Sequence, residues 1–116
     1  MKFEIEVYQK ANGDVPFDDF LEALPKKLQA KVIRDVELLE QCGNSLREPY
    51  SKHLSDGIYE LRTKVSTDIT RSLYFFFDGR RIVITHGFIK KQSKTPQSEI
   101  DRAKEYRSDW IRRNEK

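Results

Sequence analysis

The first residues of the chain alternate between apolar and polar side chains. Within residues 2–9 every second position is apolar, namely Phe3, Ile5 and Val7. A period of two predicts a strand with one buried face. The turn-forming residues 11–14 end this strand, and Asp14 is placed to cap a helix that has Pro16 in its first turn.

From there to residue 42 the apolar spacing changes to three and four, which is typical of helices. A short first helix has its apolar residues at Phe17, Phe20, Leu21 and Leu24. Pro25 separates it from a longer helix over 25–42, whose apolar face is formed by Leu28, Val32, Val36 and Leu39. Gly43 and Asn44 end this helix. Two consecutive amphipathic helices predict a helical hairpin that lies on a sheet.

The second half of the chain has strand-like patterns. A loop at 44–57 precedes three such segments, at 58–65, 69–77 and 81–89, and Asp78-Gly79 joins the last two as a two-residue hairpin turn. A final helix is expected from Thr95, its N-cap, with an apolar face of Ile100, Ala103, Tyr106 and Trp110. The order β-α-α-β-β-β-α predicts one α+β domain over 1–116. It has a small, mostly antiparallel sheet, the helical hairpin on one face, and a C-terminal helix.

Composition narrows the class of protein. With 116 residues, of which 37% are hydrophobic, the chain can bury one core although 35% of its residues are charged. No apolar run approaches the ~20 residues that span a membrane, and the N-terminus lacks a signal-peptide pattern. The single cysteine, Cys42, has no partner for an internal disulfide. We expect a soluble cytoplasmic protein that does not bind membranes.

The charge is distributed unevenly. Residues 1–57 contain 8 Lys and Arg against 11 Asp and Glu, whereas residues 80–116 contain 11 against 5. Within the second segment, Lys90, Lys91 and Lys94 directly follow the last predicted strand. Such asymmetry favours a polyanionic partner over an evenly solvated surface.

Common catalytic signatures are missing from the sequence. It has no glycine-rich phosphate loop, no G-x-S-x-G and no H-E-x-x-H motif. The only histidines are His53 and His86, which excludes a multi-histidine metal site. An enzyme acting on a phosphodiester is then expected to work without a metal or another cofactor.

Strand parity singles out three basic residues. Arg62 and Lys64 share the polar face of the strand over 58–65. Arg71 shares its face with Leu73, Phe75 and Phe77, where an unpaired guanidinium is costly. Arg71 therefore either forms an ion pair, with Glu60 or Asp68, or faces an open anion-binding cleft.

Two further candidate site residues, His86 and Tyr74, can each be interpreted in two ways. Parity predicts His86 on the face of Ile82, Ile84 and Phe88, as a hydrogen-bonded core residue or as a general acid–base group. Tyr74 could stack on a nucleobase, although aromatic residues in strands are core residues by default. Lys52, Lys64 and Lys94 are further candidate contacts for a nucleic acid.

Three segments together resemble a known family: GIYELR (57–62), TRSLYFFFDGRRIVITHGFIKK (70–91) and TPQSEIDRAKEYRSDW (95–110). They are similar to the RelE/ParE toxin superfamily and, within it, to the HigB-like, phage-derived branch. The resemblance implies a RelE-like sheet with the helical hairpin on one face and a basic cleft on the other. It also implies the toxin of a type II toxin–antitoxin system, a ribosome-dependent mRNA endoribonuclease that works without metal.

The resemblance carries over residue by residue. Arg62, Arg71, Lys90 and Lys91 occupy positions where family members place basic residues of the site, and His86 is a further acid–base candidate. Tyr106 and Trp110 fall in core-like register, in a longer helix, where better-defined relatives have a catalytic tyrosine. The implied partners are the ribosome and mRNA, a helix-turn-helix antitoxin, and operator DNA bound through the toxin–antitoxin complex.

The chemistry fits this interpretation, because RNA carries its own nucleophile, the 2′-OH. Fixed Arg and Lys side chains would align it with the scissile phosphate and stabilise the charge of the transition state. Two alternatives stay open. The ParE branch shares the fold but poisons gyrase, and an inactive member would use its basic face only to bind the antitoxin and DNA.

Overall fold

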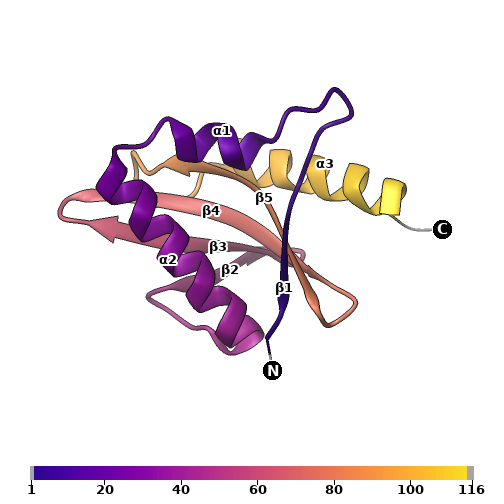
Figure 1. The fold of residues 1–116 in the computed structure, drawn as a ribbon, viewed down its shortest axis with the longest axis horizontal. Helices are drawn as coiled ribbons and strands as arrows, with labels where there is room; N and C mark the ends of the chain where they lie inside the picture. Colours follow the sequence, from indigo (N-terminus) through magenta and orange to yellow (C-terminus); the bar gives the residue numbers. More distant parts are fainter. Residues whose placement is uncertain (1, 115–116) are drawn as a thin grey trace.

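The computed structural model describes residues 2–114, which form one five-stranded sheet with helices on both faces (Figure 1). The elements in chain order are β1 (Glu4–Val7), α1 (Pro16–Glu22), α2 (Lys26–Cys42), the 3₁₀ helix η1 (Gly43–Ser45), β2 (Ser51–Ser55), β3 (Ile58–Val65), β4 (Asp68–Phe77), β5 (Arg81–Ile89) and α3 (Gln97–Asn114). Across the sheet the order is β1-β5-β4-β3-β2, with β1 parallel to β5 and the other neighbours antiparallel. The predicted α+β class with a mostly antiparallel sheet is confirmed.

The helical hairpin of α1 and α2 covers one face of the sheet, as predicted. Its buried side chains pack on those of the strands in a core that contains Phe17, Leu24, Leu28, Val32, Leu39, Leu61, Tyr74, Ile82 and Ile84. Burying each large side chain contributes about 1.5–3 kcal/mol. A Cβ on Gly87 would lie 2.4 Å from the ring of Phe20, so glycine at this position lets α1 lie directly on β5.

The C-terminal helix α3 covers the opposite face. Ala103 and Trp110 join a second core with Tyr8, Ile58, Leu73, Phe75 and Val83. The hydroxyl of Tyr8 donates a hydrogen bond of 2.7 Å to Asp109, which ties α3 to the segment after β1. The resemblance implied an open basic cleft across this face. Because α3 occupies much of this face, the cleft that contains Arg62, Lys64 and Arg71 lies at the end of the sheet where β3 ends and β4 begins.

Several boundaries differ from the sequence-based expectations. The turn between β4 and β5 has three residues, 78–80, and not two, and α3 begins at Gln97, so Thr95 is not directly before its first residue. The predicted loop at 44–57 contains the edge strand β2, which pairs antiparallel with β3. Its sequence, SKHLS, is polar and has no clear alternation, so the strand forms through its partner and not through its own pattern. The N-cap of α1 is Val15 without a side-chain bond, while the carboxylate of Asp14 accepts a hydrogen bond from Asn12 within the preceding turn.

A β-bulge in β5 overturns the predicted orientation of His86. Leu73 pairs with His86 but Tyr74 pairs with Ile84, so Thr85 is an extra residue on this strand. The extra residue reverses the alternation, and His86 does not share the face of Ile82 and Ile84. It lies on the α3 face, where its ring centroid is 5.5 Å from that of Tyr106.

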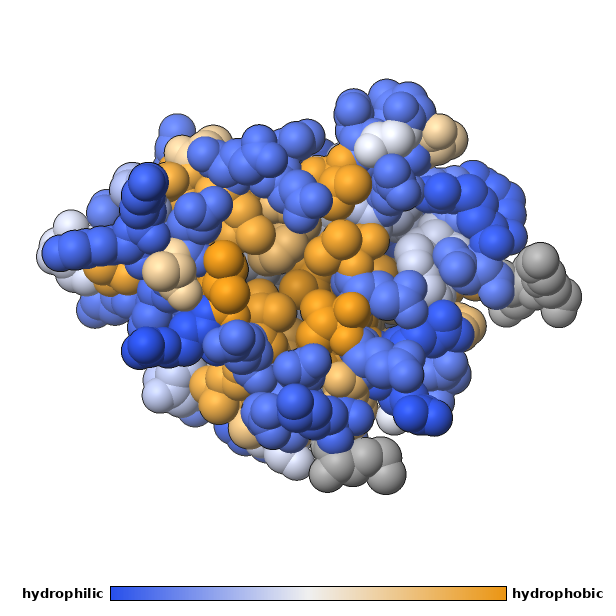
Figure 2. Space-filling model, viewed as in Figure 1, coloured by the Kyte–Doolittle hydropathy of each residue, from blue (hydrophilic) through white to orange (hydrophobic). Residues whose placement is uncertain are grey.

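The face that carries α1 and α2 shows an apolar surface in its centre, surrounded by polar side chains (Figure 2). Large apolar side chains that stay exposed include Val7 on β1, at 38%, and Ile33 on α2, at 46%. None of the helices in residues 2–114 has the length and the apolar character needed to cross a membrane.

Candidate functional site

A cleft of about 440 Å³ lies at the end of the sheet, beside the free edge of β3. Helix α2, the loop before β2, the strands β3 and β4, and the segment after β5 all contribute to it. Its lining residues are Lys31, Asp35, Pro49, Tyr50, Arg62, Lys64, Ile69, Arg71, Lys90 and Ser93. We call this cavity the basic cleft, because half of its lining residues are Lys or Arg.

The ladder of the sheet explains how these side chains meet. The pairing of β2 with β3 ends at Ser51 and Leu61. Beyond it, the Arg62 N–H donates a hydrogen bond of 2.8 Å to the carbonyl of Tyr50. Lys64 then lies on an edge that no strand covers. On the other side, the Lys90 N–H donates 2.8 Å to the carbonyl of Ile69, which holds the start of the loop before α3.

Arg71 is the most buried of these cations, with 3% of its surface exposed. Its Nη1 lies 3.3 Å from Glu60 Oε1, and its Nη2 donates 2.8 Å to the carbonyl of Ser93. The hydroxyl of Thr95 contacts both Arg71 and Glu60. The structure has the ion pair, with Glu60 and not Asp68 as the partner, and Arg71 also lines the basic cleft. This arrangement joins β3 and β4 to the loop that precedes α3.

Glu60 also binds Arg62, so one buried carboxylate serves two guanidinium groups. Arg62 Nε lies 2.8 Å from Glu60 Oε2, and its Nη1 lies 3.7 Å from the exposed Glu48. The group of Arg71, Glu60 and Arg62 therefore keeps a positive charge next to the cleft. Because Arg62 is half-buried and held from both sides, it presents a fixed cation to a bound anion.

Two of the three lysines that line the basic cleft, Lys64 and Lys90, have no acidic partner among the described residues. Among residues 2–114, no acidic group lies within ion-pair distance of Lys64 or Lys90. Lys31 does have a partner, the buried carboxylate of Asp35 at 2.8 Å. The two lysines without a partner are therefore the cations most available to a phosphate group.

The remaining predicted lysines lie around the basic cleft. Lys91 and Lys94 line a neighbouring cavity of about 630 Å³ that shares Lys90 and Arg71 with it. Lys52 and Lys94 line a smaller cavity of about 150 Å³ together with Arg62 and Arg71. The fold thus gathers Arg62, Lys64, Arg71 and Lys90 in one cleft, with Lys91, Lys94 and Lys52 beside it.

His86 lies outside the basic cleft. Its Nε2 is 2.9 Å from Glu99 Oε1 on α3, and its Nδ1 is 3.1 Å from the hydroxyl of Thr85. Burial lowers the pKa of His86, so the neutral imidazole dominates at neutral pH. With both ring nitrogens engaged, His86 connects α3 to β5 and has the hydrogen-bonded core role that the sequence left open.

Tyr74 also has the core role. It is 1% exposed, its ring stacks on Tyr59 with centroids 5.5 Å apart, and its hydroxyl binds Ser51. Burial raises the pKa of Tyr74 to about 12. Its ring faces are therefore covered by neighbouring side chains. The aromatic residue at the cleft is Tyr50, which is 44% exposed.

Sequence reasoning missed three charged or aromatic residues of the cleft, Lys31, Asp35 and Tyr50, as well as Pro49, Ile69 and Ser93. Asp35 did carry a signal, because it falls on the apolar stripe of α2 with Val32 and Leu39, where a charged residue is unusual. Tyr50 lies in a loop without periodicity and gave none. No group of three or more His, Cys, Asp or Glu among residues 2–114 is arranged to hold a metal ion.

Comparison with known proteins identifies the family. The model of the family described as Phage derived protein Gp49-like (DUF891) matches residues 19–108, well over half of the chain. A comparison with curated proteins gives no match. The matched segment contains the second half of α1, all of α2, every strand except β1, all lining residues of the basic cleft and most of α3. The chain belongs to the Gp49-like family of phage-derived proteins.

Proposed function

We propose that this protein is the toxin of a type II toxin–antitoxin system and cleaves mRNA on the ribosome. The observation that carries the proposal is the convergence of Arg62, Lys64, Arg71 and Lys90 on one cleft. Membership of a phage-derived family is compatible with the HigB-like branch that the sequence resembles. Several fixed cations in a cleft are what a phosphodiester substrate requires.

The proposed reaction uses the 2′-OH of the RNA as the nucleophile. Lys64 and Lys90 bind the scissile phosphate, and Arg62, held by Glu60, adds charge to the pentavalent transition state. Each such donor contributes about 3 kcal/mol to the lowering of the barrier. Attack of the 2′-oxygen on phosphorus breaks the bond to the 5′-oxygen of the next nucleotide; the 2′-OH loses a proton and the departing 5′-oxygen gains one. The products are a 2′,3′-cyclic phosphate, which a water molecule can open to a 3′-phosphate, and a free 5′-OH.

Arg71 has a different role in this scheme. Its guanidinium already binds Glu60, Thr95 and Ser93, so it acts as a positioning residue for the loop that carries Lys90 to Lys94. Tyr50, exposed at the same cleft, offers a ring on which a base next to the scissile phosphate can stack.

The antitoxin is expected to bind the helical hairpin. The apolar surface in the centre of the α1 and α2 face supports this location (Figure 2). Exposed apolar patches framed by polar residues mark protein interaction sites more often than catalytic ones. An antitoxin bound there would block access to the ribosome without entering the basic cleft.

The test is to induce the protein in bacterial cells and follow growth and transcript integrity together. Wild type should stop growth and produce cut transcripts, whereas Lys64→Ala/Lys90→Ala should do neither. Lys26→Ala/Lys27→Ala removes the same charge from exposed positions at the start of α2 and should behave as wild type. Growth arrest with DNA damage and intact transcripts would indicate a gyrase-type toxin, and normal growth an inactive member.

A further inference from the structure

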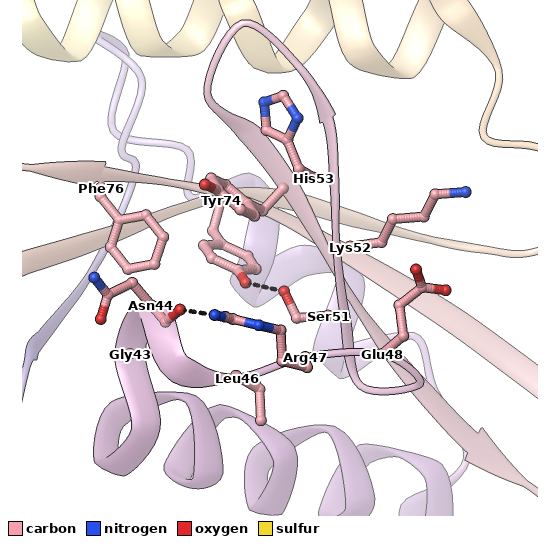
Figure 3. Close-up of a pocket in the computed structure, with 11 residues that line it drawn as sticks. Gly43, Asn44, Leu46, Arg47, Glu48, Ser51, Lys52, His53, Tyr74 and Phe76 are labelled. Atoms are coloured by element: carbon pink, nitrogen blue, oxygen red, sulfur yellow. Dashed lines mark hydrogen bonds between the residues drawn. The ribbon is translucent and has the colours of Figure 1, made fainter.

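Another cavity, of about 520 Å³, lies between η1 and β2 (Figure 3). We call it the aromatic pocket, because Tyr59, Tyr74 and Phe76 line it together. Their ring centroids are 5.3 to 5.7 Å apart, so the three rings form one cluster, in which Tyr59 and Phe76 are half-buried and Tyr74 is buried behind them. The volume falls in the range of about 300–1,000 Å³ that is usual for small-molecule sites.

Polar groups surround this aromatic surface. Arg47 and Lys52 are exposed, and Lys52 forms no ion pair within residues 2–114. Arg47 Nη1 donates 2.7 Å to the carbonyl of Asn44, which leaves its other donors for a ligand. The amide side chain of Asn44 offers one donor and one acceptor direction, as the edge of a nucleobase requires. The acidic residue in the pocket, Glu48, is directed toward Arg62 at 3.7 Å.

His53 completes the pocket in a fixed orientation. Its Nε2 accepts a hydrogen bond of 3.1 Å from the Gly57 N–H, and its ring meets that of Tyr59 edge-on at 5.0 Å. An aromatic surface with cations at its border is the general arrangement by which proteins hold single-stranded nucleic acid. Bases stack on the rings while the phosphates bind the cations.

The aromatic pocket and the basic cleft are linked by residues that line a third cavity between them. Lys52 and His53 line both this pocket and the cavity of about 150 Å³ that contains Arg62 and Arg71. Arg62 and Arg71 in turn line the basic cleft. A nucleic acid strand that occupied both the cleft and the pocket would have to cross the edge strand β2 near Lys52.

We propose that the aromatic pocket binds one nucleobase of the RNA strand, away from the scissile phosphate, with the adjoining phosphate held by Arg47 and Lys52. This inference rests on the proposed ribonuclease function. The pocket selects RNA segments by the base that enters it, and it adds affinity without taking part in the reaction. Asn44 distinguishes between bases through the hydrogen bonds of its amide.

The pocket can be tested apart from catalysis, with a mononucleotide as the probe. AMP is titrated into the full chain while backbone amide signals are followed by NMR. The expected result is saturable shifts at Asn44, Arg47 and Lys52, with ribose 5-phosphate binding about ten-fold more weakly because it has no base to stack. Shifts confined to the basic cleft, equal affinities for the two probes, or no shifts at millimolar AMP would overturn the proposal.

Substitutions test whether Arg47 and Lys52 contact the phosphate of AMP. Arg47→Gln/Lys52→Gln should weaken AMP binding about ten-fold, in line with two lost phosphate contacts. The matched control, Lys27→Gln/Arg80→Gln, removes the same charge from exposed residues that do not line the pocket and should leave the affinity unchanged. Equal losses in both variants would reduce the effect to net charge and overturn the assignment.

The transcript assay described above separates the two proposals. Cleavage of mRNA without AMP shifts at the pocket would remove the aromatic pocket and keep the nuclease. AMP bound at the pocket with intact transcripts would remove the nuclease, and with it the assignment of the bound base to an mRNA substrate.

Discussion

Arg71 lines the same cleft as Lys64 and Lys90, but its side chain is paired with an acidic residue and theirs are not. Arg71 is buried, and Glu60, Thr95 and the Ser93 carbonyl bind its guanidinium. Lys64 is exposed and Lys90 half-buried, and neither has an acidic partner among the described residues. Positive charge alone therefore does not identify a binding residue. A buried cation that binds an internal carboxylate is needed by the fold, because its removal leaves that carboxylate underpaired, whereas an exposed cation without an acidic partner is available to a ligand.

Replacing Arg71 should have the largest effect, and it should be on stability. Arg71→Ala leaves the carboxylate of Glu60 buried with one partner fewer, which costs about 3–5 kcal/mol in the free energy of unfolding. Urea denaturation measures this loss, with Lys91→Ala as the exposed control, expected within about 0.5 kcal/mol of wild type. An unchanged urea midpoint for Arg71→Ala would contradict the structural role.

Replacing Lys64 and Lys90 should have the opposite result, a loss of activity without a loss of stability. Lys64→Ala/Lys90→Ala should lower the rate of mRNA cleavage by about 100-fold or more, because two donors to the phosphate are lost. The urea midpoint should stay at the wild-type value, since neither side chain has an internal partner to lose. A double variant that unfolds more easily and cleaves normally would reverse the comparison.

Lys91 and Lys94 should have a smaller effect, since they line the neighbouring cavity and not the basic cleft. Lys91→Ala/Lys94→Ala is expected to weaken RNA binding by a few-fold and to reduce its dependence on salt concentration. Binding of a labelled single-stranded RNA at two or more ionic strengths measures both quantities. If Lys91→Ala/Lys94→Ala lost as much RNA affinity as Lys64→Ala/Lys90→Ala, then Lys91 and Lys94 would bind RNA as directly as Lys64 and Lys90, against this expectation.

His86 is a buried residue whose charge changes with pH, so its effect on stability should depend on pH. Burial lowers its pKa below the ordinary value of 6.5, so below that pH the unfolded chain binds a proton more readily than the folded one. The free energy of unfolding should therefore decrease as the pH falls through 6.5. Chemical denaturation at several pH values should show a shallower decrease for His86→Gln. Parallel curves for the two proteins would show that His86 does not cause it.

Much of the fold could be predicted from the sequence because the pattern of apolar residues is strong where the elements are buried. The helical hairpin, the strands β3 to β5 and the helix α3 all follow from periodicity. Strand β2 could not be predicted, since its polar residues are held by pairing with β3 and not by burial of their own. The bulge at Thr85 has no signature in the sequence, and it moved His86 to the other face.

The site was predictable in its residue types more than in their roles. Parity correctly flagged Arg71 as needing a partner, but only the fold shows that Glu60 supplies it. Tyr74 and Tyr50 are both tyrosines, and burial alone separates the core residue from the exposed one. Such differences depend on which side chains the tertiary structure covers, and a linear pattern does not contain that information.

The central claim is that the basic cleft cuts mRNA, and primer extension on a reporter mRNA in a translation extract tests it most directly. The comparison is between wild type and Lys64→Ala/Lys90→Ala, each with and without ribosomes, after denaturation curves have established that both are folded. We predict discrete cuts that require ribosomes and disappear in the double variant. An intact transcript with wild type, or the same cuts with both proteins, would contradict the account.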